Sequence, residues 1–143
     1  MKFRKALNGD LKQLESILKK SKLPYEDCKY HLNNFVLMES DKEIVAIGGS
    51  EMFGDIALLR SITVLKQYQG NGLGNSIFFK IKKDLIVRGV KTIYLLTETA
   101  EEYFRALGFE QTSRDIVPQQ IKKTKQFSSL CPSSAVVMKC VVQ

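Results

Sequence analysis

The sequence has few of the residues that build metal centres and disulfide frameworks. It contains three cysteines, Cys28, Cys131 and Cys140, without a Cys-x-x-Cys pair, and its only histidine is His31. A structural zinc site needs four Cys, His or acidic ligands at close spacing, so we predict no metal site. An odd number of widely spaced cysteines does not form a disulfide framework, and we expect reduced, mostly buried thiols.

Long apolar runs, repeats and linkers are also missing. No stretch approaches the ~18 consecutive apolar residues that a membrane span needs. The first residues lead directly into a helix pattern, without the apolar core of a signal peptide. We therefore expect a soluble, cytoplasmic protein with no membrane partner. The 143 residues read as one domain, 1–143, long enough to bury about two-thirds of the surface of the unfolded chain.

Positive charge is in excess, because the sequence has 22 basic residues and 15 acidic ones. A basic surface attracts nucleic acid, anionic membranes or phosphorylated cofactors. The lysines are scattered over three segments, which is typical of solvated helix faces. Aromatic residues do not alternate with basic ones as they do in RNA-stacking surfaces, so we predict no nucleic-acid partner.

The first half of the chain has the pattern of an antiparallel sheet. An amphipathic helix follows Asn8-Gly9-Asp10, and Leu23-Pro24 ends it. We predict a second helix over 25–33, because proline suits a first helical turn. Alternating apolar residues and a turn at Asp41-Lys42 predict strands over the following ranges: 3–6, 35–40, 43–50 and 56–64.

The second half has a different pattern. Helix spacing of apolar residues covers 75–88, and Gly89 follows as a stop signal. An almost wholly apolar strand is predicted over 91–97. Thr99 is the predicted cap of a helix over 100–107. The remaining predicted elements are a strand over 109–117, a helical stretch over 119–127 and a closing strand over 135–142.

A glycine-rich turn, Gln69-Gly70-Asn71-Gly72-Leu73-Gly74, separates the two halves. It stands between a strand and a helix, where unpaired N–H groups and the positive end of the helix dipole attract anions. Glycine lets the backbone approach a phosphate and adopt positive φ. A nucleotide P-loop would need Lys-Ser/Thr after Gly74, and a dinucleotide fingerprint would need glycine at Asn75. Neither is present.

Gln69-x-x-Gly72-x-Gly74 matches the Q/R-x-x-G-x-G/A signature of the GNAT superfamily of N-acetyltransferases, which the chain resembles over nearly its whole length. The order of elements and the segment from Ala100 to Leu107-Gly108-Phe109 strengthen the resemblance. It implies an α+β, three-layer fold. We expect a mixed, mostly antiparallel sheet of six to seven strands, splayed at its centre and flanked by about four helices.

The resemblance also implies a cofactor, acetyl-CoA. The strand Ile62-Thr63-Val64 would hydrogen-bond the pantetheine arm, and the backbone of the turn would hold the pyrophosphate. The coenzyme-binding residues implied in this way are Ile62, Thr63, Val64, Gln69, Gly70, Asn71, Gly72, Leu73, Gly74, Asn75 and Phe104.

The catalytic groups are less clearly indicated. Many relatives protonate the leaving thiolate with a Tyr four residues before the Gly of the Gly-Phe pair, where this chain has Phe104. Tyr103 is adjacent, but one helical step turns it by about 100°. We therefore name Thr97, water or backbone N–H groups as alternatives. Glu51 is the first candidate for the base, with water as the alternative. Cys131 has no evident activating partner for covalent catalysis.

Arg60 is a charged residue in an apolar strand, and alternation places it on the face of Ile62 and Val64. It is a clamp for a substrate carboxylate, one half of an internal salt bridge with Glu51 or Glu98, or a residue on an exposed strand face. The segment 118–134 is predicted to form a lid or wall over the acceptor pocket. The alternative is that it packs across the sheet or builds a dimer. The candidates for contact with the acceptor are Arg60, Ser61, Arg114, Thr124, Phe127, Cys131 and Ser134.

Three further segments resemble the GNAT branch labelled arsenic-resistance N-acetyltransferase, and one of them also resembles bacterial N-acetylglutamate synthases. They are Leu58-Leu59-Arg60-Ser61, residues 95–100 and residues 127–135. We therefore expect an N-acetyltransferase whose acceptor is the amine of a small amino acid or analogue. The alternatives are a GNAT-fold sensor that binds acyl-CoA and a protein or peptide acetyltransferase. Relatives are often dimers, so a homodimer is one expected assembly.

Overall fold

The computed structural model describes residues 1–143 and contains seven strands in the order β1-β2-β3-β4-β5-β7-β6. By its internal contacts the chain forms two compact units. The first unit is Met1–Glu51 with Leu59–Asp84, and the second is Met52–Leu58 with Leu85–Gln143. None of the helices is long and apolar enough to cross a membrane.

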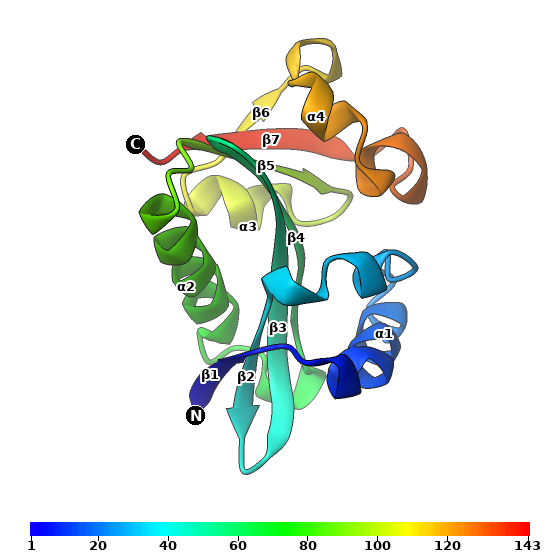
Figure 1. Ribbon diagram of the computed structural model, residues 1–143, viewed down its shortest axis with the longest axis vertical. Coiled ribbons are helices and arrows are strands. Elements are labelled where there is room, and N and C mark those ends of the chain that lie inside the picture. The colour runs from blue at the N-terminus through cyan, green and yellow to red at the C-terminus, as the bar shows by residue number, and fades with distance from the viewer. The chain divides into compact units, whose positions relative to one another are not determined.

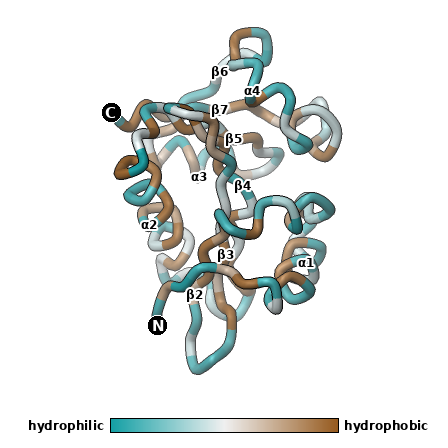
Figure 2. Tube along the Cα trace, in the orientation of Figure 1, coloured by the Kyte–Doolittle hydropathy of each residue, from teal (hydrophilic) through white to brown (hydrophobic).

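In the first unit, β1 (Lys2–Lys5), β2 (Phe35–Ser40) and β3 (Glu43–Phe53) pair antiparallel in sequence. Asp41 and Lys42 have φ of 51° and 68° and form the tight hairpin turn that the sequence predicted. This turn is the hydrophilic tip between the two strands in Figure 2.

Helices α1 (Leu11–Lys20) and α2 (Leu73–Val87) lie on opposite sides of these strands (Figure 1). Leu14, Leu18 and Phe35 are fully buried in the core on the α1 side. On the other side, a Cβ placed on Gly48 would stand 2.6 Å from Ile77 of α2. Residue 48 is therefore glycine because the strand and the helix approach closely there.

The segment between α1 and β2 differs from the prediction. The expected helix over 25–33 is instead two short 3-10 turns, Cys28–Tyr30 and Leu32–Asn34. Apolar side chains in this segment, Cys28 and Leu32, are buried in the α1-side core. Packing thus holds the segment against the strands in a form too irregular for helix periodicity to predict.

In the second unit, β5 (Thr92–Thr97) pairs in parallel with Ile56–Leu58 of β4 (Ile56–Val64). Strand β7 (Val136–Val141) lies antiparallel between β5 and β6 (Glu110–Thr112), as Figure 1 shows. The helices are α3 (Glu101–Ala106) and α4 (Gln119–Lys122). The expected strand over 109–117 is shorter, because a 3-10 turn occupies Arg114–Ile116, where Ser113 accepts a hydrogen bond from the N–H of Asp115.

The predicted fold class is confirmed: a mixed, mostly antiparallel seven-stranded sheet with four α-helices. A five-residue π-helix, Gln126–Leu130, follows α4 within the expected helical stretch. The splay of the central strands and the single domain stay predictions.

Candidate active site

The glycine-rich turn joins β4 to α2 and lies in the first unit. Gly70 and Gly72 have φ of 85° and 76°, in the left-handed region where side chains are disfavoured. Two side chains fold back onto the turn: Gln69 donates from Nε2 to the carbonyl of Val64, and Asn71 from Nδ2 to that of Tyr68. The turn is therefore braced by its own residues.

The turn borders open space. A Cβ at Gly70 or Gly72 would meet no atom within 4 Å, so both residues border open space. Their positive φ, and not a close contact, is therefore the reason that glycine stands at these positions. The turn leads directly into α2, a helix of 15 residues. The first N–H groups of a helix point out of its N-terminal end. This is the arrangement in which backbone amides and a helix dipole bind an anion.

Strand β4 ends beside this turn and contains an unsatisfied polar atom. The hydroxyl oxygen of Thr63 is buried and has no hydrogen-bond partner. A buried hydroxyl without a partner costs free energy, so such an atom calls for an explanation. A ligand with a polar group along β4 would satisfy it, which agrees with the coenzyme-binding role expected of this strand.

Ser61 breaks the alternation of β4 and corrects one prediction. Its φ is 63°, inside a strand where φ is ordinarily negative. Arg60 has its guanidinium 5.7 Å from the ring of Phe35, on the α1 side. Ile62 lies beside Gly48 with Ile77, on the α2 side. Arg60 and Ile62 thus face opposite sides, and the prediction of a shared face was wrong because a left-handed residue separates them.

Arg60 uses all five of its N–H donors inside the protein (the number that a guanidinium has). It donates to both carboxylate oxygens of Asp27 at 2.6 Å and to Oε2 of Glu51 at 3.1 Å. Its remaining donors point to Oγ of Ser61 and Sγ of Cys28. The predicted internal salt bridge with Glu51 is present. A substrate clamp stays a prediction, and it would require Arg60 to release Asp27.

The charges of this buried group stabilise one another. Burial alone would raise the pKa of Asp27, but the hydrogen bonds and charge of Arg60 hold that pKa below its ordinary value. Burial opposes the charge of Arg60 as well, and Asp27 and Glu51 outweigh it, so the pKa of Arg60 lies above its ordinary value. Burial also raises the pKa of the neighbouring Cys28 thiol to about 11, so this cysteine is not a nucleophile at neutral pH.

Glu51 is the predicted base, and its neighbours include a residue that sequence reasoning did not place there. The Nε2 atom of His31 lies 3.4 Å from Oε1 of Glu51 and 3.6 Å from Oδ2 of Asp27. The three side chains offer metal-ligand atoms within 4.8 Å of one another, although the sequence predicted no metal site. Asp27 and His31 lie four residues apart in a segment expected to be a helix, which was the available signal.

The alternative proton donors lie in the second unit. Oγ1 of Thr97 accepts a hydrogen bond from the N–H of Ala100, so Thr97, not the predicted Thr99, braces the start of α3. The ring of Phe104 packs edge-on against Phe109, with centroids 5.8 Å apart. Burial raises the pKa of the adjacent Tyr103. The acid role of Thr97 stays a prediction.

The predicted acceptor wall is also part of the second unit, and Arg114 braces it. Its Nη2 donates to the carbonyls of Ala135 and Pro132, at 2.7 and 3.3 Å, and its guanidinium stacks on Phe127. Cys131 is half-buried, with Sγ 4.0 Å from Oε1 of Gln126, and Ser134 is exposed. These contacts give Arg114 and Phe127 a structural function. Acceptor binding by this segment stays a prediction.

Solved structures with the same fold include several acetyltransferases. The N-acetylglutamate synthase of Neisseria gonorrhoeae, solved with coenzyme A and N-acetyl-glutamate, matches 99% of this chain and 35% of its own, with a TM-score of 0.86 and 18% identity. Rv2747 of Mycobacterium tuberculosis, solved with CoA, matches over the full length of both chains, with a TM-score of 0.82 and 16% identity. The ribosomal-protein-S18-alanine N-acetyltransferase of Escherichia coli matches 99% of this chain and 94% of its own, with a TM-score of 0.74 and 18% identity.

Sequence comparisons agree with the fold. An uncharacterised N-acetyltransferase of Chlorobaculum tepidum is 22% identical over 97 residues, which are 67% of this chain and 62% of the relative. The chain thus matches less than two-thirds of that relative's length. The profile of the GNAT acetyltransferase domain matches residues 11–125, most of the chain, including Glu51, Arg60 and the glycine-rich turn. The chain belongs to the GNAT family of N-acetyltransferases.

Proposed function

We propose that this protein transfers the acetyl group of acetyl-CoA to the amine of a small amino acid or analogue, by direct attack in a ternary complex. The observation that carries the proposal is the glycine-rich turn, with Gly70 and Gly72 in left-handed conformations at the start of α2. Such a turn presents backbone N–H groups to the pyrophosphate. Solved relatives in complex with coenzyme A are consistent with this cofactor.

The coenzyme would lie along two neighbouring segments of the first unit. The backbone of Ile62–Val64, with the hydroxyl of Thr63, would hold the pantetheine arm as an added strand. Residues 69–75 would hold the phosphates. Acetyl-CoA supplies the activated thioester carbonyl.

The chain's own groups would manage the protons. An ammonium must lose a proton before its nitrogen attacks the thioester, and Glu51 is the proposed carboxylate for this task. The thiolate that leaves would be protonated by Thr97 or water. A small amino acid is the favoured acceptor class because of the resemblance of the 95–100 and 127–135 segments to amino-acid acetyltransferases, with N-acetyl-glutamate in one solved relative. The arsenic-resistance branch, a cytoplasmic location and a homodimer stay predictions.

The proposal is tested with purified protein, acetyl-CoA and a panel of the standard amino acids and simple primary amines. Release of free thiol measures transfer, and titration calorimetry measures acetyl-CoA binding. We expect micromolar to millimolar binding and turnover with at least one amino acid. Absence of any heat or thermal shift with acetyl-CoA would overturn the cofactor, and with it the function.

One observation favours a second function, an acyl-CoA sensor without turnover. The position of the usual tyrosine acid is Phe104, which has no proton to donate and packs against Phe109. A sensor would bind acetyl-CoA with the same affinity but release no thiol above the background rate with any amine. Transfer to a peptide and to no free amino acid would instead indicate the protein-acetylating alternative.

A further inference from the structure

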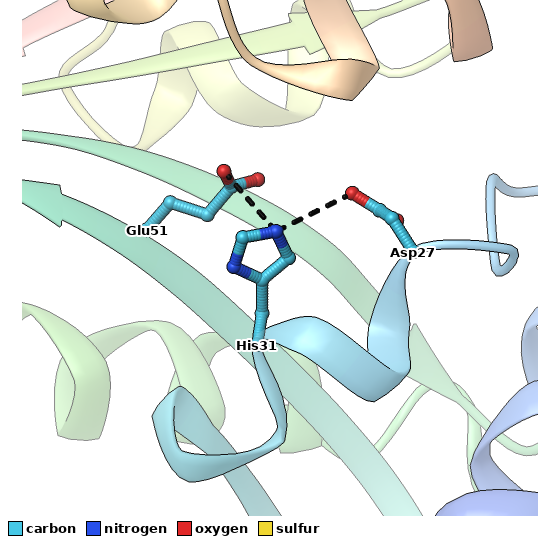
Figure 3. A group of neighbouring side chains, drawn as sticks. All are labelled: Asp27, His31 and Glu51. Carbon is cyan, nitrogen blue, oxygen red and sulfur yellow. Dashed lines mark ion pairs between the residues drawn. The ribbon is translucent and has the colours of Figure 1, made fainter.

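Asp27, His31, Glu51 and Arg60 form a buried charged cluster in the first unit, with one member that solvent reaches. Figure 3 shows the imidazole of His31 between the two carboxylates, with Nε2 turned toward both. The side chains of Asp27 and Glu51 are 4% and 5% exposed, and that of His31 is 25% exposed. His31 is therefore the most solvent-accessible of these three side chains.

The charges of the cluster do not balance by themselves. Asp27 and Glu51 contribute two negative charges, and Arg60 contributes one positive charge. With neutral His31, the buried group carries one net negative charge, which is costly away from water unless a cation compensates it. One monovalent cation restores neutrality: either the imidazolium of His31 or an ammonium that lies against the carboxylates.

A divalent metal fits the cluster less well, although the three side chains offer ligand atoms within 4.8 Å of one another. Arg60 donates to both oxygens of Asp27 and to one of Glu51, so these oxygens already face a positive group. A dication would leave the cluster with a net positive charge beside Arg60. The charge count therefore favours an ammonium.

Within the cluster, His31 is the member whose neutral ring offers a nitrogen lone pair to a proton. Both carboxylates already accept hydrogen bonds from Arg60, and the pKa of Asp27 is lowered by that contact. Histidine is the side chain that ordinarily gains and loses a proton between pH 5 and 8, the range in which a base is effective. Nε2 is turned toward both carboxylates, so in the tautomer with the proton on Nδ1 the lone pair of Nε2 faces an ammonium that lies against them.

We propose that Asp27 and Glu51 bind the ammonium of the acceptor and that His31 takes the proton which this ammonium loses. This inference rests on the proposed acetyl transfer and changes the role of Glu51 from proton acceptor to ammonium ligand and partner of His31. It adds two residues, Asp27 and His31, to the acceptor site.

The step conserves charge. The ammonium passes one proton to neutral His31, which leaves an amine and an imidazolium, and the net charge of the cluster with its ligand is zero before and after. The amine nitrogen then forms a bond to the thioester carbon, and the carbon–sulfur bond breaks with its electron pair on sulfur. The second N–H proton of the nitrogen goes to the thiolate, directly or through water.

His31 is the only histidine, so its imidazole NMR signals can be followed from pH 5 to 8 in the tag-free protein without assignment by mutation. The charged groups that face it are Asp27 and Glu51, which are both paired with Arg60, and the thiol of Cys28 stays neutral in this range. Removing a neighbouring negative charge, by Glu51→Gln or Asp27→Asn, should move the titration midpoint to lower pH, because each carboxylate lies within 3.6 Å of Nε2. Adding n-propylamine or L-glutamate should lower the midpoint in the wild type. Midpoints that stay in place would overturn the proposal.

Kinetics test the proton transfer itself. His31→Gln should lower kcat/KM by about 100-fold or more, since general-base catalysis contributes a factor of at least about that size. It should also abolish the decrease of kcat/KM toward low pH. Acetyl-CoA affinity should not change, which shows that the variant is folded. Tyr30→Gln, at the end of the turn directly before His31 but 72% exposed, is the matched control and should behave as the wild type.

The outcomes separate this inference from the proposed function. Suppose that the wild type transfers acetyl groups and that His31→Gln keeps the wild-type kcat/KM and its decrease toward low pH. The role proposed for His31 is then wrong, while the proposed function stands. If no amine is acetylated, the function fails, and the NMR titration with n-propylamine still decides whether the cluster binds an ammonium. A shift of the His31 signals by Zn²⁺ but by no amine would mean a metal site and would overturn the proposal.

Discussion

At the residue scale, removing the buried hydroxyl of Thr63 should change the stability of the protein and its affinity for acetyl-CoA in opposite directions. Its oxygen has no hydrogen-bond partner, so Thr63→Val removes an unsatisfied polar atom at nearly constant volume. We expect the free protein to gain about 1 kcal/mol of unfolding free energy, measured by urea denaturation. If the coenzyme uses this hydroxyl, acetyl-CoA affinity should fall several-fold in calorimetry.

The contrary result is equally informative at this residue. A variant that loses stability would mean that the hydroxyl is satisfied in solution. One that binds acetyl-CoA as tightly as the wild type would remove Thr63 from the coenzyme site.

Ser61 and Arg60 illustrate how far residue-level reasoning reaches. The charge of Arg60 within an apolar strand correctly indicated that it has a buried partner, and Glu51 was one of the partners named. Asp27 was missed, because it lies 33 residues away in a segment without regular structure. The left-handed φ of Ser61 was missed as well, because serine has no strong preference for that region.

At the scale of elements, the glycine-rich turn makes a prediction with an internal control. Gly72 has φ of 76°, whereas Gly74 is not among the residues with positive φ. Gly72→Val should abolish detectable acetyl-CoA binding in calorimetry, because a branched residue is strained in the left-handed region and its side chain fills part of the open space beside the turn.

Gly74→Ala is the matched variant, since alanine is also found at this position of the GNAT signature. It should keep coenzyme binding within a few-fold and raise the unfolding free energy by up to about 1 kcal/mol. Equal loss of binding in both variants would show that the space at the start of α2, and not the backbone conformation of Gly72, determines the site.

The packing of β3 against α2 makes a second prediction at this scale. A methyl group on Gly48 would lie 2.6 Å from Cγ2 of Ile77 and 2.8 Å from Cδ1 of Ile81. Gly48→Ala should therefore lower the unfolding free energy by about 1–3 kcal/mol, because these side chains must shift.

Gly9→Ala is its control in the same denaturation experiment. A Cβ on Gly9 would meet no atom within 4 Å, and its φ is not positive. The substitution should be neutral or stabilise by about 0.4–1 kcal/mol. A Gly48→Ala variant as stable as the wild type would mean that the helix and strand are less closely packed than the structure shows.

At the scale of the whole molecule, the Asp27–Arg60 pair makes stability depend on pH. The pKa of Asp27 is lowered in the folded state, so the unfolded chain takes up a proton at higher pH than the folded one. This contribution is therefore complete above about pH 4, near the ordinary carboxyl pKa, and is lost as pH falls toward the lower folded value. Urea denaturation between pH 2 and pH 7 measures it.

Asp27→Asn should lower stability at pH 7 by about 3 kcal/mol and flatten the acid side of the profile. Asp10 has the same direction of pKa shift through Arg4 but lies near the surface, so Asp10→Asn should have a smaller effect. An Asp27→Asn profile parallel to that of the wild type below pH 4 would show that this pair does not control acid unfolding.

The sequence by itself determined the features that a few adjacent residues encode. The turn at Gln69–Gly74, the Asp41-Lys42 hairpin and the apolar strands depend on local φ, periodicity and composition, and the family signature is contiguous as well. These predictions are confirmed or agree with the family match.

Only the tertiary structure decided the surroundings of the predicted base. The segment 25–34 is packed into irregular turns, and this brings Asp27 and His31 to Glu51 and Arg60 on two different strands. The face on which Arg60 lies depends in turn on one left-handed residue, Ser61. Side chains from distant segments meet through the packing of the core, and no local pattern specifies which charged groups that packing brings together.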